Sequence, residues 1–510
     1  MSLRPVLLST TLIASLPLAG YADVTPEDVW ADQVAAIEAM GMTIDAREAR
    51  SGDTLRISDV VMSSSMDMGM IESLITIRIP AIDIAEAGGG EVDMSLEGAI
   101  VYEVATPDVE EIDMSGFTSI TTAQFDGKIR VSGNPDDMVY TFDNAAASMT
   151  TDEVVIEEMT VQPAVDVAIA PISGQYTSRR SADKHEIDYA FEAGEVAYMV
   201  QPSSYGEQSV TLDATINDLT SSASMTLDRS ETPTDMMTAL LIGGALTAQQ
   251  DFAGSTFAFE MVDGETGAET QARGQTGAAK TSVTISNGVI GYDVSASDLS
   301  VSISGSQIPF PTIDLAMART GVSFQAPMVG TGDMQPFGFG LELAELVLPD
   351  MVWMMVDPAG QMAHDPATIR LSVNGEVASE TGLLDLDPMA FEEGDVPPVR
   401  LGDIALPDLF VSALGASIEG NGAGRFADED MSEEGDLPPF AGKINLTLTG
   451  VTALIDKLTS MGMLPPEQAM GAQMMLGMLA RPGANANELV SEIEMTEDGQ
   501  ILANGVPLPF

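Results

Sequence analysis

The stretch "SVTLDATIND", residues 209–218, decides the fold class of this chain. Its apolar residues Val210, Leu212, Ala214 and Ile216 alternate with polar ones. A period of two is typical of a β-strand that has one face against a core and the other face in water. The same alternation returns in residues 127–133, 281–288, 298–305, 337–343, 368–376 and 442–450.

Turn signals between these segments predict how the strands pair. Asn-Gly or Asp-Gly pairs stand at residues 287–288, 374–375, 498–499 and 504–505, as tight hairpins require. Parallel sheets need crossover helices and continuous apolar runs, and the sequence shows neither. We therefore predict a mainly β fold, a β-rich α+β protein with large curved antiparallel sheets or meanders.

A few segments carry helix signals instead of strand signals. Thr25-Pro26 opens an N-terminal helix with a capping hydroxyl before a proline. Thr232-Pro233 opens a central helix in the same way. A C-terminal helical hairpin is predicted over residues 450–481. Its second helix carries Met470, Met474, Met475 and Met478 along one side, and packing of these side chains against the sheet is the favoured interpretation.

Composition and motifs divide the chain into four parts. Residues 1–22 have a basic start, a short apolar run and small residues before a cleavage point after Ala22, which predicts an export signal. Residues 23–262 are expected to form an N-terminal helix with one half of the β-meander. The glycine-rich residues 263–280 predict a flexible loop. Residues 281–510 are expected to form the second half with the helical hairpin.

Charge and cysteine content narrow the location and the partners. The chain has 510 residues, a formal net charge of −58 and no cysteine. Nucleic acid is a poor partner for so acidic a chain. After the leader, no apolar stretch has the roughly 20 residues that a membrane-spanning helix needs. We therefore expect an exported, periplasmic protein with no transmembrane anchor in the mature chain.

Methionine clusters raise the question of a metal site. Met62, Met66, Met68 and Met70 lie close together in the sequence, and thioether ligands suit copper(I). These residues are weak copper candidates, because the chain holds 33 methionines in all and clusters arise by chance. No cofactor is expected.

Catalytic signals are scarce. The two histidines, His185 and His364, stand in polar segments that predict solvated turns. The sequence has no zinc-protease motif, phosphate-binding glycine loop or nucleophile elbow. We therefore expect a protein that is not an enzyme. An outer-membrane barrel stays a less favoured alternative, since Pro507 and Pro509 would interrupt its closing strand.

Two parts of the C-terminal half carry a resemblance. Residues 341–376 hold Trp353, Asp357-Pro358 and Asp365-Pro366, and residues 410–428 are followed by the hairpin and a closing Asn-Gly strand. These segments resemble the bacterial family described as domain of unknown function 2125. The resemblance implies an exported, β-rich envelope protein and no assigned activity. In layout the chain is also similar to AsmA-like envelope proteins, in which a curled sheet forms a groove for acyl chains.

Two hypotheses about function follow. The first is a binding protein whose apolar sheet face stays partly open to lipid or another apolar ligand, with methionine as an adaptable lining. The alternative is a structural or interaction protein of the cell envelope, with a closed core and a protein partner at its loops or edges. A copper-handling protein is less favoured than either.

Overall fold

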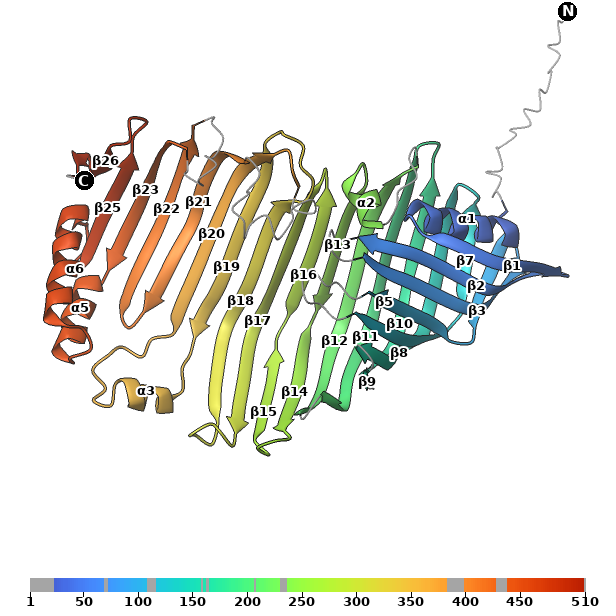
Figure 1. Cartoon of the computed structure of the whole chain (residues 1–510), viewed down its shortest axis with the longest axis horizontal. Coiled ribbons are helices and arrows are strands. Elements are labelled where there is room, and N and C mark those ends of the chain that lie inside the picture. The colour runs from blue at the N-terminus through green and yellow to red at the C-terminus, as the bar shows by residue number, and fades with distance from the viewer. Residues whose placement is uncertain are drawn as a thin grey trace, which may run out of the picture.

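A computed structural model describes residues 23–67, 72–107, 116–156, 159–161, 165–205, 208–229, 236–382, 399–427 and 438–508. Among these residues 67% lie in strands and 12% in helices, which confirms the prediction of a mainly β fold. In Figure 1 the strands lie side by side from the N-terminal end (blue) to the C-terminal end (red) of one long sheet.

The helices of the described residues lie at the two ends and along the edges of this sheet. They are α1 (Pro26–Ala39), α2 (Met236–Leu241), α3 (Asp350–Val356), α5 (Val451–Ser460) and α6 (Pro466–Leu479). The strands of the N-terminal half are β1 (Thr43–Ser51), β2 (Thr54–Asp67), β3 (Glu72–Gly88), β4 (Glu91–Glu97), β5 (Ile100–Thr106), β6 (Phe117–Asp126), β7 (Ile129–Asn134), β8 (Asp137–Ile156), β9 (Met159–Val161), β10 (Val165–Arg180), β11 (Lys184–Tyr205), β12 (Gln208–Asp228), β13 (Ala245–Phe252) and β14 (Gly254–Asp263). The remaining strands are β15 (Glu269–Thr276), β16 (Ala279–Ser286), β17 (Val289–Gly305), β18 (Ile313–Pro327), β19 (Gln335–Leu346), β20 (Ala367–Ser379), β21 (Val399–Ala413), β22 (Ala416–Phe426), β23 (Phe440–Thr449), β24 (Arg481–Pro482), β25 (Glu488–Met495), β26 (Ile501–Ala503) and β27 (Val506–Pro507).

The described residues form one antiparallel meander of 27 strands. Strands that follow each other in the chain pair directly, as in the run from β17 to β23. Where two short strands replace one long strand, both pair with the same neighbour, as β13 and β14 do with β12. The predicted antiparallel meander is therefore confirmed. The predicted turns at 287–288, 498–499 and 504–505 are also present, whereas Asn374 and Gly375 lie inside β20.

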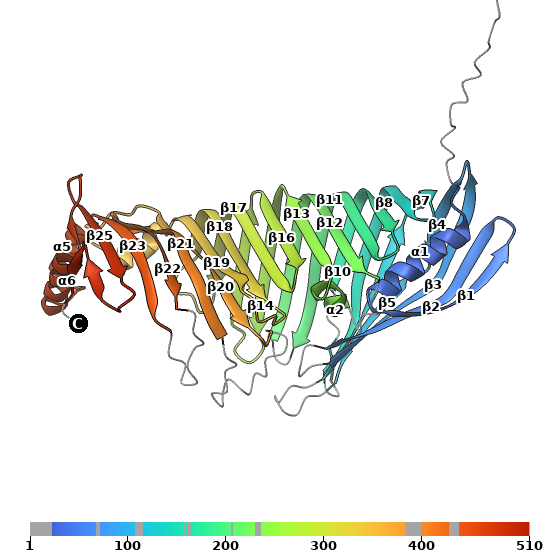
Figure 2. The same cartoon turned by 90° about the horizontal axis from the view of Figure 1, so that it is seen from above.

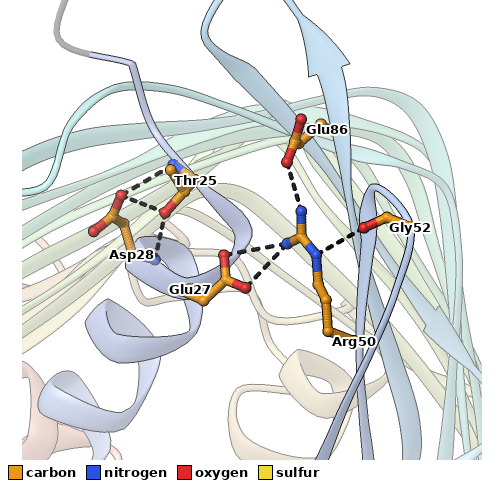
Figure 3. A network of polar contacts seen from close by, with 6 residues as sticks. All are labelled: Thr25, Glu27, Asp28, Arg50, Gly52 and Glu86. Carbon is orange, nitrogen blue, oxygen red and sulfur yellow. Dashed lines mark hydrogen bonds and ion pairs between the residues drawn. The ribbon is translucent and has the colours of Figure 1, made fainter.

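The N-terminal strands curve around α1. Thr25 caps this helix as predicted: its hydroxyl oxygen accepts from the backbone N–H of Asp28 at 3.2 Å. Arg50, at the end of β1, binds Glu27 of the helix at 3.1 Å and Glu86 of β3 at 2.5 Å (Figure 3). Buried apolar side chains of α1, among them Val29 and Trp30, pack on those of the surrounding strands. The main core of the molecule lies here.

Bulges bend the long strands. β2, β8, β12 and β17 contain Asp59, Asn144, Asp218 and Asp298, which have φ angles of 54°, 50°, 51° and 49°. Asp and Asn adopt this left-handed conformation at lower cost than other residues with side chains. The pairing of β8 with β10 shifts register opposite Asn144. The pairing of β1 with β2 shifts register next to Asp59. Since a bulge bends its strand and increases the twist, these two bulges contribute to the curvature of the sheet (Figure 2).

One face of the sheet is apolar across both halves of the molecule. Tyr176 of β10 lies between Tyr140 of β8 and Tyr189 of β11. The same row continues through Ala223, Ala248, Val283, Tyr292, Phe324, Phe339 and Val373, each opposite the next. Residues directly opposite in paired strands point to the same side. We call the side that carries this row the apolar face.

Helices cover the apolar face unevenly. α1 packs over Tyr140 and the neighbouring strands. Side chains of α2, including Leu240, pack with Leu227 of β12 and Ile285 of β16 in a second buried cluster. Beyond β17 the face leaves large side chains partly in solvent, with Phe324 41% and Phe339 45% exposed. The predicted N-terminal helix, central helix and C-terminal helical hairpin are confirmed, but they cover only part of the face.

One expectation from the sequence is wrong, and one helix was not expected. Residues 263–280 are not a flexible loop, because they contain β15, which pairs with β14 and β17 and keeps the sheet continuous. Gly274, which suggested a loop, gives room to the ring of Phe257 on the neighbouring strand. The sequence also gave no signal for α3, a helix of 7 residues that follows Pro349.

Among the described residues, no helix combines the length and apolar character that crossing a membrane requires.

Candidate functional site

An apolar groove lies on the apolar face where strands β20 to β25 cross it. It has a volume of about 320 Å³ and is lined mainly by side chains of the apolar face. Its lining comprises Val373, Ile404, Ala405, Leu406, Gly422, Ala423, Gly424, Phe440, Gly442, Lys443, Ile444, Ile493 and Met495. We call this hollow the apolar groove. Concave, apolar sites of this size are the usual form of small-molecule binding sites.

Glycines make the groove possible. Ile404, Gly424, Gly442 and Met495 lie opposite one another on four successive paired strands. The ring of Phe440 lies where a Cβ on either glycine would be, so that neither position accepts a side chain without a shift of the ring. A second row, through Gly422, Ile444 and Ile493, runs beside it. The floor of the groove is therefore backbone with one aromatic ring laid across it.

The glycines of β22 were missed as site residues in the sequence. Gly420, Gly422 and Gly424 stand at every second position of this strand. With the period of two they occupy the apolar face, where large side chains would otherwise fill the space. Glycine inside a strand often marks a close approach of another group, and this spacing was the signal for the groove.

The residues of the family-like motif come together at α3. The ring of Trp353 stacks on His364 with centroids 4.2 Å apart and planes at 9°. Asp357 is buried, and its carboxylate accepts from the backbone N–H of Met362 at 2.5 Å. This hydrogen bond, with a smaller contribution from His364 at 3.4 Å, holds the pKa of Asp357 below its usual value. Pro358, Asp365 and Pro366 belong to the same loop between α3 and β20.

This arrangement organises a loop. The Asp357 carboxylate, just after α3, is bound by the backbone N–H groups of Gln361 and Met362 in the loop. The stacked rings of Trp353 and His364 connect α3 to the same loop. His364 is partly exposed, with 38% of its side chain in solvent. The prediction that it stands in a turn agrees with the structure, which places it between α3 and β20.

His185 is not the solvated turn residue that the sequence suggested. It lies in β11 with no exposed surface. Its Nε2 atom is 2.7 Å from the hydroxyl of Ser178, which in turn donates to Asp32 of α1 at 2.9 Å. Burial lowers the pKa of His185, so the neutral form is favoured. The alternating pattern of β11 begins at His185 and indicates a strand. The charged residues beside it indicated a turn, and the sequence interpretation followed them.

The contacts of Asp32 explain why this cluster ties α1 to the sheet. Its carboxylate accepts from the hydroxyl of Tyr140 at 2.7 Å and forms an ion pair with Arg180 at 3.0 Å. Because Ser178 gives its single proton to Asp32, the Nε2 of His185 donates to the Ser178 oxygen and does not activate it as a base. This order differs from that of a catalytic Ser-His-Asp triad, in which the histidine takes the serine proton.

The methionine predictions have different outcomes. Met62 is buried in the core cluster that packs around α1. The side chain of Met66 lies outside the described residues, as do Met68 and Met70 entirely. The expectation that the methionines of α6 pack against the sheet is wrong. Met470, Met474, Met475 and Met478 are between 44% and 67% exposed.

The reason lies in which side of α6 faces the sheet. Ala469 is 6% exposed and, with Leu476, lies on the inner side of the helix. The carbonyl of Leu479 accepts from Ser491 of β25 at 2.6 Å and from Asn504 at 3.0 Å, which anchors the end of the helix. Small inner residues allow close packing, and the methionines are left on the outer side.

Known proteins give no family for this chain: neither the family models nor the curated proteins with which it was compared match it. The resemblances described from the sequence stay predictions.

Proposed function

We propose that this protein is an exported, periplasmic, non-enzymatic binding protein that takes lipid or another apolar ligand in the apolar groove and along the neighbouring apolar face. The observation that carries the proposal is the partly exposed row of large apolar side chains that leads to the groove. A contiguous exposed apolar surface is unfavourable in water and commonly marks a binding site.

The dimensions of the face support an elongated ligand. Paired strands lie about 4.8 Å apart. The uncovered stretch from β18 to β25 crosses seven strands in sequence, β18 to β23 and β25, so it measures roughly 29 Å across the strands. One leaflet of a bilayer has a hydrocarbon thickness of about 15 Å, half of the full core. A single acyl chain therefore fits on the uncovered face.

The lining supports an apolar ligand and gives little for a polar one. Phe440, Ile444 and Ile493 present hydrocarbon to the groove. Lys443 is among the lining residues, but its ammonium group pairs with Glu492 at 2.9 Å. Lys443 lies opposite Glu494 of β25 and diagonal to Glu492. All three are on the other face from Ile444, since neighbours in a strand alternate. Binding would therefore depend on shape and apolar contact.

Extraction of lipid from the native protein tests the proposal. The mature chain is purified from the periplasm without detergent and extracted with organic solvent, and the extract is analysed by mass spectrometry. We expect stoichiometric lipid from the wild type and much less from Ile444→Glu, which places a carboxylate in the groove. Asn445→Glu adds the same charge to the opposite, exposed side of the same strand and should leave the lipid content unchanged.

The result against the proposal is equally specific. Absence of lipid from the folded wild type, with a protein partner co-purified in its place, would favour the structural or interaction role over ligand binding.

A further inference from the structure

The outer side of α6 carries a row of exposed thioethers. Met470, Met474 and Met478 follow one another at four-residue intervals and are 67%, 64% and 44% exposed. Residues four apart on a helix are neighbours on one face. Each thioether is therefore next to another, and the whole row is accessible from solvent.

The two sides of the hairpin differ in the type of large apolar residue that they use. Within α5 and α6 the half-buried large apolar residues are Val451, Leu454, Ile455, Leu458, Leu476 and Leu479, and the half-buried Met461 lies just after α5. No methionine is among those of the two helices, whereas the exposed large apolar residues of α6 are all methionine. Leucine provides equal apolar surface and the same volume class. The segregation therefore indicates a requirement for sulfur on the outer side.

The surroundings of the row argue against a membrane or protein contact as its main purpose. Residues 450–483 contain no Phe, Tyr or Trp. Their charged residues are Asp456, Lys457, Glu467 and Arg481, two acidic and two basic, for a net charge of zero. Interfacial membrane helices usually combine Trp, Phe or Leu with many Lys or Arg residues. Protein interfaces concentrate their affinity in Trp, Tyr and Arg.

Thioethers bind soft metal ions and discriminate against hard ones. The chain has no cysteine to compete for such an ion, and its net charge of −58 raises the local concentration of cations. In the described part of the chain, no group of three or more His, Asp or Glu side chains is placed to hold a metal. The thioether row is thus a donor set of a different kind from those that hold zinc or calcium.

We propose that Met470, Met474 and Met478 form a surface site for a soft monovalent metal ion, copper(I), held by neighbouring thioether sulfurs. Binding needs no redox step, because the ion enters and leaves in the same oxidation state. The long, flexible methionine side chains allow sulfurs from adjacent turns to approach one ion. This site is independent of the apolar groove and of the ligand proposed for it.

Silver(I), a stable soft ion of the same charge, is the first probe. The mature chain, labelled with ¹³C at the methionine methyl groups, is titrated with silver nitrate in chloride-free buffer. We expect the methyl signals of Met470, Met474 and Met478 to shift together and to saturate at one ion per chain. Movement of other methionine signals without these three would overturn the proposal.

A leucine variant separates sulfur chemistry from apolar character. The triple variant Met470→Leu, Met474→Leu and Met478→Leu keeps the apolar surface but removes the thioethers. We expect it to retain one silver ion fewer per chain after desalting. We also expect its affinity for copper(I), measured anaerobically against a chromogenic chelator, to fall by about tenfold or more. Undiminished binding by the folded triple variant would show an apolar surface only and refute the metal site.

The matched control uses exposed methionines outside the helices. Met334 and Met463 are 39% and 50% exposed, similar to Met478 of the proposed site, but they lie outside α6 and its row. The variant Met334→Leu, Met463→Leu should bind silver(I) and copper(I) as the wild type does. Equal losses in both variants would mean that exposed methionines bind without regard to arrangement, which contradicts the proposal.

Discussion

Removal of the Asp32 carboxylate should loosen the N-terminal half of the molecule. Asp32 has no exposed surface and is the shared partner of Arg180, Tyr140 and Ser178, with contacts of 2.7 to 3.0 Å. In Asp32→Ala the guanidinium of Arg180, only 15% exposed, keeps its charge without this partner. Loss of one member of a buried ion pair costs about 3–5 kcal/mol. We expect a loss of that size in the free energy of unfolding.

Trp30 provides a local probe for this prediction. The chain has two tryptophans, and Trp30 is buried in α1, where it donates to Glu48 at 2.9 Å. In a Trp353→Phe background, its fluorescence during urea titration reports the packing of α1 on the sheet. The midpoint of the transition should move to lower urea in Asp32→Ala.

An exposed ion pair is the control. Arg319 and Glu342 lie 3.0 Å apart with 55% and 33% of their side chains exposed. Since surface pairs contribute about 0–1 kcal/mol, Glu342→Ala should leave the stability almost unchanged. A loss below about 1 kcal/mol in Asp32→Ala would refute the argument that the buried cluster ties α1 to the sheet.

The remaining predictions concern pH, backbone and export. Because the pKa of His185 is lowered in the folded protein, the unfolded chain takes up a proton at this histidine at higher pH than the folded chain does. The free energy of unfolding should therefore decrease as the pH falls below about 6.5. In urea titrations, His185→Gln should lack this pH dependence. The pKa of Asp357 is also lowered, so its contribution to the stability of the folded loop should be full above about pH 4 and lost below. A change in Trp353 fluorescence should report this loss, and Asp357→Asn should not show the change. At Asp218, with φ 51°, valine should cost about 1–2 kcal/mol and glycine much less, as thermal unfolding can measure. N-terminal sequencing of the periplasmic protein should begin at Asp23, and retention of residues 1–22 would contradict the predicted export.

Local pattern predicted the strands because alternation depends only on each residue and its neighbours. "SVTLDATIND" became part of β12, and the turns at Asn287 and Asn504 formed where the sequence placed them. The N-terminal helix was equally predictable, since the Thr25 cap is a local hydrogen bond. These features need no knowledge of the rest of the fold.

Features that depend on register or on long-range packing could not be predicted in the same way. The apolar face exists because Tyr292, Phe324 and Phe339 lie opposite one another, and the alternation of each strand does not fix that alignment. The side of α6 that meets the sheet was chosen wrongly, because Ala469 and Met470 are both compatible with a buried stripe. The burial of His185 depends on Asp32, which is 153 positions earlier in the chain.

Photo-crosslinking in living cells tests the central claim, an apolar face open to an apolar ligand, most directly. A benzophenone amino acid is placed at position 444 in the groove or at position 445 on the opposite side of β23, and the irradiated protein is weighed intact. We expect an added lipid mass at position 444 and none at position 445. Absence of the adduct at position 444, or equal adducts at both positions, would contradict the claim.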